Sequence, residues 1–252
     1  MTPFYESDRA VSEYLLFHYG ESQEILPYKG GPVEALDYPV RCVNHFASDI
    51  QYFEGMRALD LGCAVGRSTF ELARYCGEVI GIDYSERFVA SGDRLRESGE
   101  LAYSFVDHGE LTRKVVARIP KEIDRTRVRF EQGDAMLLRE GLGVFDVILM
   151  ANLIDRLVDP TKCLGSLAGL VRAGGYVILT SPYTWLEEYT PKDHWIGGRT
   201  QGKQVLSTED ALGEVMGDSF EMVGRDDLPF LIREHARKYQ WSVAQGTLWR
   251  LK

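Results

Sequence analysis

The sequence has no long hydrophobic segment and no excess of basic residues. No window approaches the roughly 20 consecutive apolar residues that a membrane-spanning helix needs, and Glu6, Asp8 and Arg9 interrupt the N-terminus where a signal peptide would be apolar. Its 29 Lys and Arg residues face 38 Asp and Glu residues, which gives a formal net charge of -9. Binding that rests on phosphate neutralisation is therefore disfavoured. We expect a cytoplasmic protein that binds neither a membrane nor nucleic acid.

Cysteine is also scarce, with four residues among 252. No Cys-x-x-Cys pair occurs, so no metal site is predicted. Scattered cysteines are typical of reduced core residues in a reducing compartment. The position of Cys63 in a glycine-rich loop makes a nucleophile conceivable, but no base is placed to activate its thiol, so a packing role is favoured.

From residue 56 onward, short apolar runs alternate with helical periodicity. Apolar runs cover residues 57–62, 78–85, 127–135, 145–152 and 174–182, and helical patterns cover 67–76, 86–98 and 161–172. Alternation of strand and helix at this spacing predicts an α/β fold. We expect a Rossmann-like, doubly wound sheet of seven mostly parallel strands with an antiparallel C-terminal edge strand.

The remaining segments complete a single predicted domain over residues 1–252. Helices are expected at 7–20, 38–52 and 208–217, an insertion at 100–127, and two closing strands at 220–228 and 239–252. We divide this domain into an N-terminal helical cap (1–55), a cofactor-binding core (56–182), and a substrate-side lid with the closing strands (183–252).

The stretch "ALDLGCAVGRS" at 58–68 places a glycine loop directly after the first core strand. Ligands of doubly wound sheets bind at this edge, and Gly62 and Gly66 let the backbone approach one closely. The nicotinamide fingerprint has glycine at its third and sixth positions, where this chain has Ala64 and an arginine. The pattern therefore disfavours NAD, and Asp60 before the glycines suits a cationic or amino group.

Acidic residues end three successive core strands. Asp60 precedes the glycine loop, Asp83 ends the second strand and Asp134 ends the third. A carboxylate in the position of Asp83 accepts the hydroxyls of a ribose, and Asp134 is suited to the exocyclic amine of an adenine. Each acid alone could equally well cap a turn, so the inference rests on their joint spacing. Together they describe a site for an adenosine without phosphate, which S-adenosylmethionine fits.

Four motifs, "ALDLGCAVGRS", "VIGIDYS", "FEQGDAM" and "FDVILMANLIDRLVDP", together resemble the ordered motifs of class I S-adenosylmethionine-dependent methyltransferases. The resemblance implies an enzyme that binds S-adenosylmethionine and releases S-adenosylhomocysteine. The cofactor contacts that it implies are Asp60, Gly62, Cys63, Ala64 and Gly66 around the methionine part, Asp83 and Tyr84 at the ribose, Asp134 and Ala135 at the adenine, Asn152 near the methyl group, and Arg41 at the carboxylate.

The flanking segments resemble a narrower group, the methyltransferases of ovothiol biosynthesis. The similarity lies in "FYESDRAVSEYLLFHYG", "YPVRCVNHF", "ANLIDRLVDP" and "LTSPYTWLEEYTPKDHWIGG". It implies methylation of the imidazole π nitrogen of 5-thiohistidine (4-mercaptohistidine) to give ovothiol A, by an enzyme that works with, or is fused to, a sulfoxide synthase. Two alternatives remain: a methyltransferase with another small-molecule acceptor, and a nonenzymatic subunit that binds S-adenosylmethionine.

Residues after the fourth and fifth core strands are the candidates for acceptor chemistry. We expect Asn152, Asp155 and His194 to take part in catalysis, the histidine as a general base by residue type. Aromatic rings would cover a flat heterocycle, and an arginine would clamp a carboxylate. The acceptor-binding candidates are Tyr14, Asp155, Arg156, Tyr183, Trp185 and Arg233. The competing interpretation is structural, with an exposed Asp155–Arg156 ion pair and ring packing for the aromatic residues.

Overall fold

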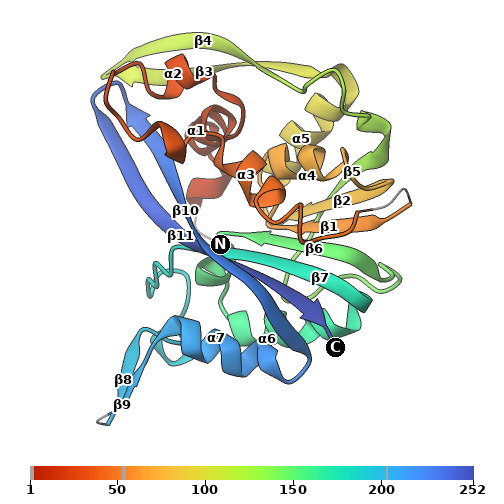
Figure 1. Ribbon diagram of the computed structural model, residues 1–252. Helices are drawn as coiled ribbons and strands as arrows, with labels where there is room; N and C mark the ends of the chain where they lie inside the picture. Colours follow the sequence, from red (N-terminus) through yellow and green to blue (C-terminus); the bar gives the residue numbers. More distant parts are fainter. Residues whose placement is uncertain (1–2, 53–54, 203) are drawn as a thin grey trace.

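A seven-stranded sheet forms the centre of the protein in the computed structural model, which describes residues 3–52, 55–202 and 204–252 (Figure 1). Across the sheet the strands follow the order β10 (Phe220–His235), β11 (Lys238–Leu251), β7 (Val171–Ser181), β6 (Phe145–Ala151), β1 (Arg57–Leu61), β2 (Glu78–Asp83) and β5 (Val128–Gln132). β11 is antiparallel to both of its neighbours, and the other pairings are parallel. Strand order reverses between β1 and β6, where ligands of doubly wound sheets bind.

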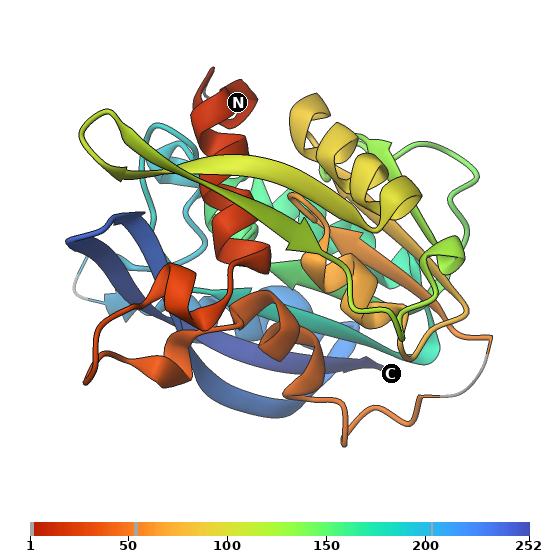
Figure 2. The same cartoon turned by 90° about the horizontal axis from the view of Figure 1, so that it is seen from above.

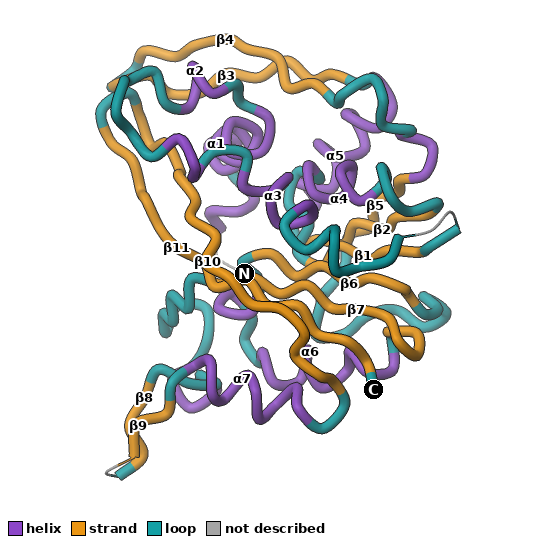
Figure 3. Tube along the Cα trace, in the orientation of Figure 1, coloured by secondary structure: helices purple, strands orange, loops and turns teal. Residues whose placement is uncertain are grey.

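Helices cover both faces of the sheet (Figures 1 and 3). One layer contains α1 (Asp8–Tyr19), α3 (Tyr38–Asn44), α4 (Arg67–Leu72) and α5 (Glu86–Ser98), and the other contains α6 (Pro160–Ser166) and α7 (Thr208–Gly217). The central strands read as continuous apolar runs because both of their faces are buried. In β1, Ala58 packs into the core of the first layer, whereas Leu59 and Leu61 pack into that of the second. This alternation places Asp60 on the first-layer face, toward α4.

Shorter elements connect these layers. They are α2 (Ser22–Ile25) and the 3-10 helices η1 (Pro3–Glu6), η2 (Val33–Ala35), η3 (Arg125–Arg127), η4 (Ile154–Arg156), η5 (Leu167–Gly169) and η6 (Lys192–His194). Two antiparallel hairpins, β3 (Glu100–His108) with β4 (Leu111–Arg118) and β8 (Arg199–Gln201) with β9 (Gln204–Leu206), lie outside the sheet. The β3–β4 hairpin passes across α1 (Figure 2). No helix in the described residues is long and apolar enough to cross a membrane.

The predicted sheet of seven mostly parallel strands with an antiparallel C-terminal strand is confirmed. The edge position differs, because β11 lies between β7 and β10 and leaves β10 outside. β11 contributes the buried Leu248 and Trp249, whereas β10 exposes Glu221, Asp226 and Asp227. Charged side chains protect an edge strand from further pairing, so β10 is the better edge.

Two predicted segments have different structures from those expected. The helix expected at 38–52 ends at Asn44 and continues as turns, and the insertion at 100–127 is largely the β3–β4 hairpin. The predicted helix start at Ser7 is confirmed, since the Ser7 side chain accepts a hydrogen bond from the Ala10 amide. The division into cap, core and lid stays a prediction.

Arg233, on the part of the β10–β11 hairpin that extends beyond its pairing with β7, joins three segments. Its Nη1 donates to the carbonyl of Glu24, its Nη2 donates to Asp107 Oδ1 at 2.7 Å, and its Cζ lies 4.9 Å from the centroid of the Phe105 ring. Only 1% of the Arg233 side chain is exposed. Through these contacts the Arg233 guanidinium holds α2 and β3 against β10. The sequence instead leads us to expect that it binds the acceptor.

Replacing Arg233 by Met should lower the free energy of unfolding by about 2 kcal/mol, because the part-buried Glu24 carbonyl and Asp107 carboxylate both lose their donor. Urea denaturation measures this loss. Arg237→Met, on an exposed arginine at the tip of the same hairpin, is the control and should change stability by less than about 0.5 kcal/mol. Unchanged stability of the Arg233 variant together with lost acceptor turnover would instead place Arg233 in the site.

Candidate active site

Three residues of the loop between β1 and α4 have positive φ angles. Gly62, Ala64 and Gly66 have φ of 74°, 47° and 84°. Glycine adopts this region freely, and larger residues would also collide. A Cβ at Gly62 would lie 2.9 Å from Leu153 Cδ1, and one at Gly66 would overlap the Phe130 ring. The loop therefore curves tightly around the end of β1, with Ala64 as its one side chain in the left-handed region.

Asp83 fixes this loop to the end of β2. Its Oδ2 accepts a hydrogen bond from the Ala64 amide at 2.8 Å, and its Oδ1 accepts one from the Ser85 amide at 2.9 Å. Burial raises the pKa of Asp83 from 3.8 to about 6, against the lowering effect of these two amides. Each oxygen keeps a lone pair, so the ionised group can still accept a pair of ribose hydroxyls.

Asp60 is a buried carboxyl without a cation. Only 1% of the residue is exposed, and Oδ2 accepts a hydrogen bond from Thr69 Oγ1 at 2.7 Å. No ion pair to Asp60 occurs among the described residues. Burial raises its pKa from 3.8 to about 7. A buried carboxyl that has no cationic protein partner is suited to a cationic ligand group, such as the ammonium of a methionine moiety.

The residues expected at the adenine and the rest of the ribose lie at the ends of β5 and β2. Asp134 is half-buried, and its Oδ1 accepts a hydrogen bond from the Met136 amide at 2.8 Å, which holds the turn that contains the half-buried Ala135. Tyr84 is 50% exposed. These positions line the same edge of the sheet as Asp60 and Asp83.

Asn152 follows β6 with a φ of 52° and belongs to a hydrogen-bond network. Its amide donates to the Thr180 carbonyl at 2.8 Å, and its Oδ1 accepts from the Tyr38 hydroxyl at 2.7 Å. The Tyr38 hydroxyl also lies 2.7 Å from Thr180 Oγ1. Sequence reasoning missed Tyr38, because no spacing pattern connects the start of α3 with the ends of β6 and β7.

Arg41, one turn after Tyr38 on α3, is held by backbone carbonyls. Its Nε donates to the Leu36 carbonyl at 2.8 Å, and its Nη2 donates to the Pro229 carbonyl. Its Cζ lies 5.7 Å from the centroid of the Tyr38 ring. The side chain is thus fixed close to the Asn152 network, and its role toward the cofactor carboxylate stays a prediction.

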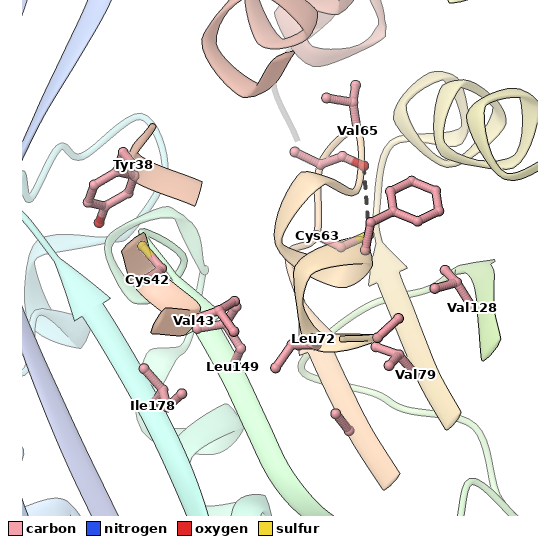
Figure 4. Packing of buried hydrophobic residues seen from close by; sticks show 14 of the residues in the cluster. Tyr38, Cys42, Val43, Cys63, Val65, Leu72, Val79, Val128, Leu149 and Ile178 are labelled. Atoms are coloured by element: carbon pink, nitrogen blue, oxygen red, sulfur yellow. Dashed lines mark hydrogen bonds between the residues drawn. The ribbon is translucent and has the colours of Figure 1, made fainter. Parts of the chain in front are cut away.

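Cys63 is packed in the interior rather than presented to a ligand. The residue is 2% exposed, and its thiol donates to the Ala64 carbonyl at 3.6 Å, as the dashed line in Figure 4 shows. Burial raises the pKa of Cys63 well above 9, so its thiol stays protonated and a nucleophilic role is disfavoured. No cluster of three or more potential metal-binding side chains occurs in the described part of the chain.

Asp155 connects η4 to the segment after β7. The residue is fully buried, so the competing interpretation of an exposed ion pair is wrong. Its carboxylate accepts from the Thr184 amide at 3.1 Å and Ser181 Oγ at 3.3 Å, and it pairs with Arg156 Nη1 at 2.9 Å. Burial raises the pKa of Asp155, and Arg156 opposes that rise. These contacts give Asp155 a positioning role.

The structure brings Tyr14 and Arg156 together with two residues that sequence reasoning missed. The ring centroids of Tyr5 and Tyr14 lie 6.1 Å apart, and those of Tyr5 and Tyr189 lie 6.3 Å apart. Arg156 Cζ lies 4.8 Å from the Tyr189 centroid. We call Tyr5, Tyr14 and Tyr189 the tyrosine cluster. Its members come from η1, α1 and the segment after β7, so only tertiary packing reveals it.

Tyr183, Trp185 and His194 attach the segment after β7 to the rest of the protein. The Tyr183 hydroxyl donates to Gln245 Oε1 at 2.7 Å, and Trp185 Nε1 donates to Thr208 Oγ1 at 3.0 Å. His194 is exposed, donates from Nδ1 to the Val158 carbonyl at 2.8 Å, and lines a surface hollow of about 460 Å³ beside α7. The structure therefore groups His194 with the α6–α7 layer rather than with Asn152.

Replacing Asp60 by Asn should stabilise the ligand-free protein at pH 8 by roughly 2–4 kcal/mol. The raised pKa means that the folded state binds the Asp60 proton more tightly than the unfolded state does. Protonated Asp60 makes its full contribution to the free energy of unfolding below about pH 4, and this contribution is lost as the pH rises through about 7. Denaturation at several pH values should show a gain that grows over this window, whereas a constant gain would contradict the assignment.

Comparisons with known proteins find similar methyltransferases. A family model described as "Methyltransferase domain" matches residues 59–179. A ubiquinone biosynthesis O-methyltransferase of Caulobacter vibrioides is 26% identical over 206 residues, which cover 77% of this chain and 69% of that protein. A protein of the same name from Ruegeria pomeroyi is 28% identical over 225 residues, covering 84% of this chain and 79% of that protein.

Solved structures share the fold at low sequence identity. The N-methyltransferase NodS from Bradyrhizobium japonicum, in complex with S-adenosyl-L-homocysteine, superposes with a TM-score of 0.52 and 14% identity, covering 96% of this chain and 98% of that chain. The YcgJ protein from Bacillus subtilis gives a TM-score of 0.56 and 13% identity, covering 84% of this chain and 98% of that chain.

The residues matched by the family model run from β1 to β7 and include the glycine loop, Asp83 and Asn152. S-adenosylmethionine is the methyl donor, and its binding at the carboxyl edge of the sheet stays a prediction. The chain is an S-adenosylmethionine-dependent methyltransferase.

Proposed function

We propose that this methyltransferase acts on the imidazole π nitrogen of 5-thiohistidine and produces ovothiol A and S-adenosylhomocysteine. The resemblance of the flanking motifs to methyltransferases of ovothiol biosynthesis supports this acceptor. The observation that carries the proposal is that the side chains hydrogen-bonded to Asn152 carry no charge and include no base.

Tyr38, Asn152 and Thr180 make up this network. None of the three side chains is a proton acceptor at neutral pH, since burial raises the pKa of Tyr38 well above 10 and keeps its phenol protonated. A phenolic acceptor must lose a proton to react, so it gains from a nearby base. A neutral imidazole nitrogen already carries an available lone pair. A network without a base therefore suits a ring nitrogen.

An aromatic group of Phe17, Tyr38 and Phe230 lies beside this network. Phe17 and Tyr38 are stacked with centroids 6.0 Å apart, and the Tyr38 and Phe230 centroids lie 4.8 Å apart. Aromatic faces pack well against planar rings and exclude water. This supports a flat, small heterocycle as the acceptor.

The chain's own contribution to the reaction is alignment and exclusion of water. When bound, S-adenosylmethionine supplies a methyl group that the sulfonium charge already activates. Asn152 and Thr180 fix the turn after β6, and the Tyr38 hydroxyl holds the Asn152 side chain in place. Such alignment can supply much of a rate enhancement. The sulfur of 5-thiohistidine is the softer nucleophile, so selectivity for nitrogen must come from positioning.

Similarity to the two ubiquinone biosynthesis O-methyltransferases makes a phenolic oxygen the second candidate acceptor. A phenolic oxygen must lose a proton before it attacks the methyl group, whereas a neutral imidazole nitrogen need not. Comparing the turnover of the two kinds of acceptor therefore separates the two proposals.

Incubation with S-adenosylmethionine and 5-thiohistidine should give a singly methylated product. NMR should locate the new methyl group on the π nitrogen, and histidine, catechol and a simple thiol should react much more slowly. A product methylated only on sulfur, or turnover of catechol alone, would overturn the proposed acceptor.

Tyr38→Phe should reduce kcat about fivefold to tenfold, because the loss of one hydroxyl frees both Asn152 and Thr180. Affinity for S-adenosylhomocysteine, measured by calorimetry, should change little. Tyr75→Phe is a matched control, since the Tyr75 hydroxyl also donates to an asparagine, Asn44 Oδ1, at 2.8 Å, but lies before β2 at the opposite edge of the sheet. Equal kcat losses in both variants would show that Tyr38 acts only through stability.

A further inference from the structure

Arg156 is oriented by hydrogen bonds that all use one of its nitrogens. Nη1 donates to the Asp155 carbonyl at 2.8 Å, to Asp155 Oδ2 at 2.9 Å and to the Thr184 carbonyl at 3.1 Å. No hydrogen bond from its Nε or Nη2 occurs in the part of the chain that the structure describes. The guanidinium is therefore fixed along one edge, and its other donors remain available to a ligand.

The tyrosine cluster surrounds this guanidinium with further donors. Arg156 packs over the Tyr189 ring, and Tyr14 packs against Phe88 with centroids 4.6 Å apart. Burial raises the pKa of Tyr14 well above 10 and that of Tyr189 to about 12, so both phenols keep their protons. Burial lowers the pKa of Arg156, but Asp155 and the three phenols raise it more, and the side chain stays cationic. Protonated phenols and an arginine are suited to an anion.

The positions of Arg156 and Tyr189 favour the acceptor over the cofactor. The acids expected to hold the cofactor end β1, β2 and β5, whereas Arg156 follows β6 and Tyr189 follows β7. An acceptor must approach the methyl group from the side opposite the sulfonium, over the ends of β6 and β7. Arg156 follows Asn152 by four residues and lies in the same connection.

We propose that Arg156 and the tyrosine cluster bind a carboxylate of the methyl acceptor. The guanidinium would form charge-assisted hydrogen bonds to the carboxylate, and the phenols would add neutral ones. This inference rests on the proposed function in that an amino acid carries such a carboxylate. It adds a specificity element, because an acceptor without the carboxylate leaves these half-buried donors without a ligand partner.

The test compares Arg156→Gln with the wild-type full chain on acceptor pairs that differ only in the carboxylate. The first pair is 5-thiohistidine and its decarboxylated amine, and the second is 3,4-dihydroxyphenylalanine and its decarboxylated amine. The substitution should raise KM for a carboxylated acceptor about 10- to 100-fold. The decarboxylated partner should change less than about twofold, and so should the Kd of S-adenosylhomocysteine. Calorimetric titration into the S-adenosylhomocysteine complex gives the same comparison without turnover.

Control variants separate the subsite from a structural role. Arg237→Gln removes another arginine that lies over a tyrosine, with Cζ 5.6 Å from the Tyr28 centroid, and should leave both members of each pair unchanged. Tyr189→Phe should give a smaller loss confined to the carboxylated acceptor. Equal losses on both members of a pair, or a matching loss of S-adenosylhomocysteine affinity, would overturn the subsite. Carboxylate dependence seen only with the phenolic pair would support the subsite and overturn 5-thiohistidine as acceptor.

Discussion

The backbone at the carboxyl ends of the strands depends on one side chain, Asp83, which holds the glycine loop in place. Asp83 accepts the amides of Ala64 and Ser85, so it ties the loop after β1 and the start of α5 to the end of β2. Ala64 reaches Asp83 only in the left-handed backbone region. That conformation costs an alanine roughly 1–2 kcal/mol, and a charge-assisted hydrogen bond offsets a cost of this size. The motif therefore tolerates a methyl group where glycine is usual.

Elements outside the strand and helix alternation complete the site. α1 carries Tyr14 and Phe17, and the β3–β4 hairpin crosses over it (Figure 2). Arg233 fastens that hairpin to the extended end of β10. Ser85 Oγ also donates to the Tyr5 carbonyl at 3.0 Å, which secures η1 above α5. On the proposed assignment, the core sheet carries the residues predicted to contact the cofactor, and the added N-terminal segments carry several of those proposed to face the acceptor.

The sheet and its acids were predictable because local patterns encode them. Buried strands such as β6 are apolar throughout, and polar residues end them where the chain leaves the core. Asp60 and Asp83 follow such runs directly, so their common edge could be inferred. The burial of Asp155 was not predictable, since the sequence gives no indication that Ser181 and Thr184 enclose it. Arg233 looked like a ligand-binding arginine for the same reason, although it is a buried link between hairpins.

The sequence by itself determined the fold and the methyl donor, because short-range periodicity specifies strands and helices, and the motifs at the strand ends resemble those of methyltransferases. Tertiary structure alone decided which side chains meet across that edge. Tyr38 and Asn152 are separated by 114 residues and are joined by a 2.7 Å hydrogen bond. Tyr5 and Tyr189 meet only because η1 and the segment after β7 fold over the same place. Contacts at such separations come from the packing of whole elements, which no local pattern records.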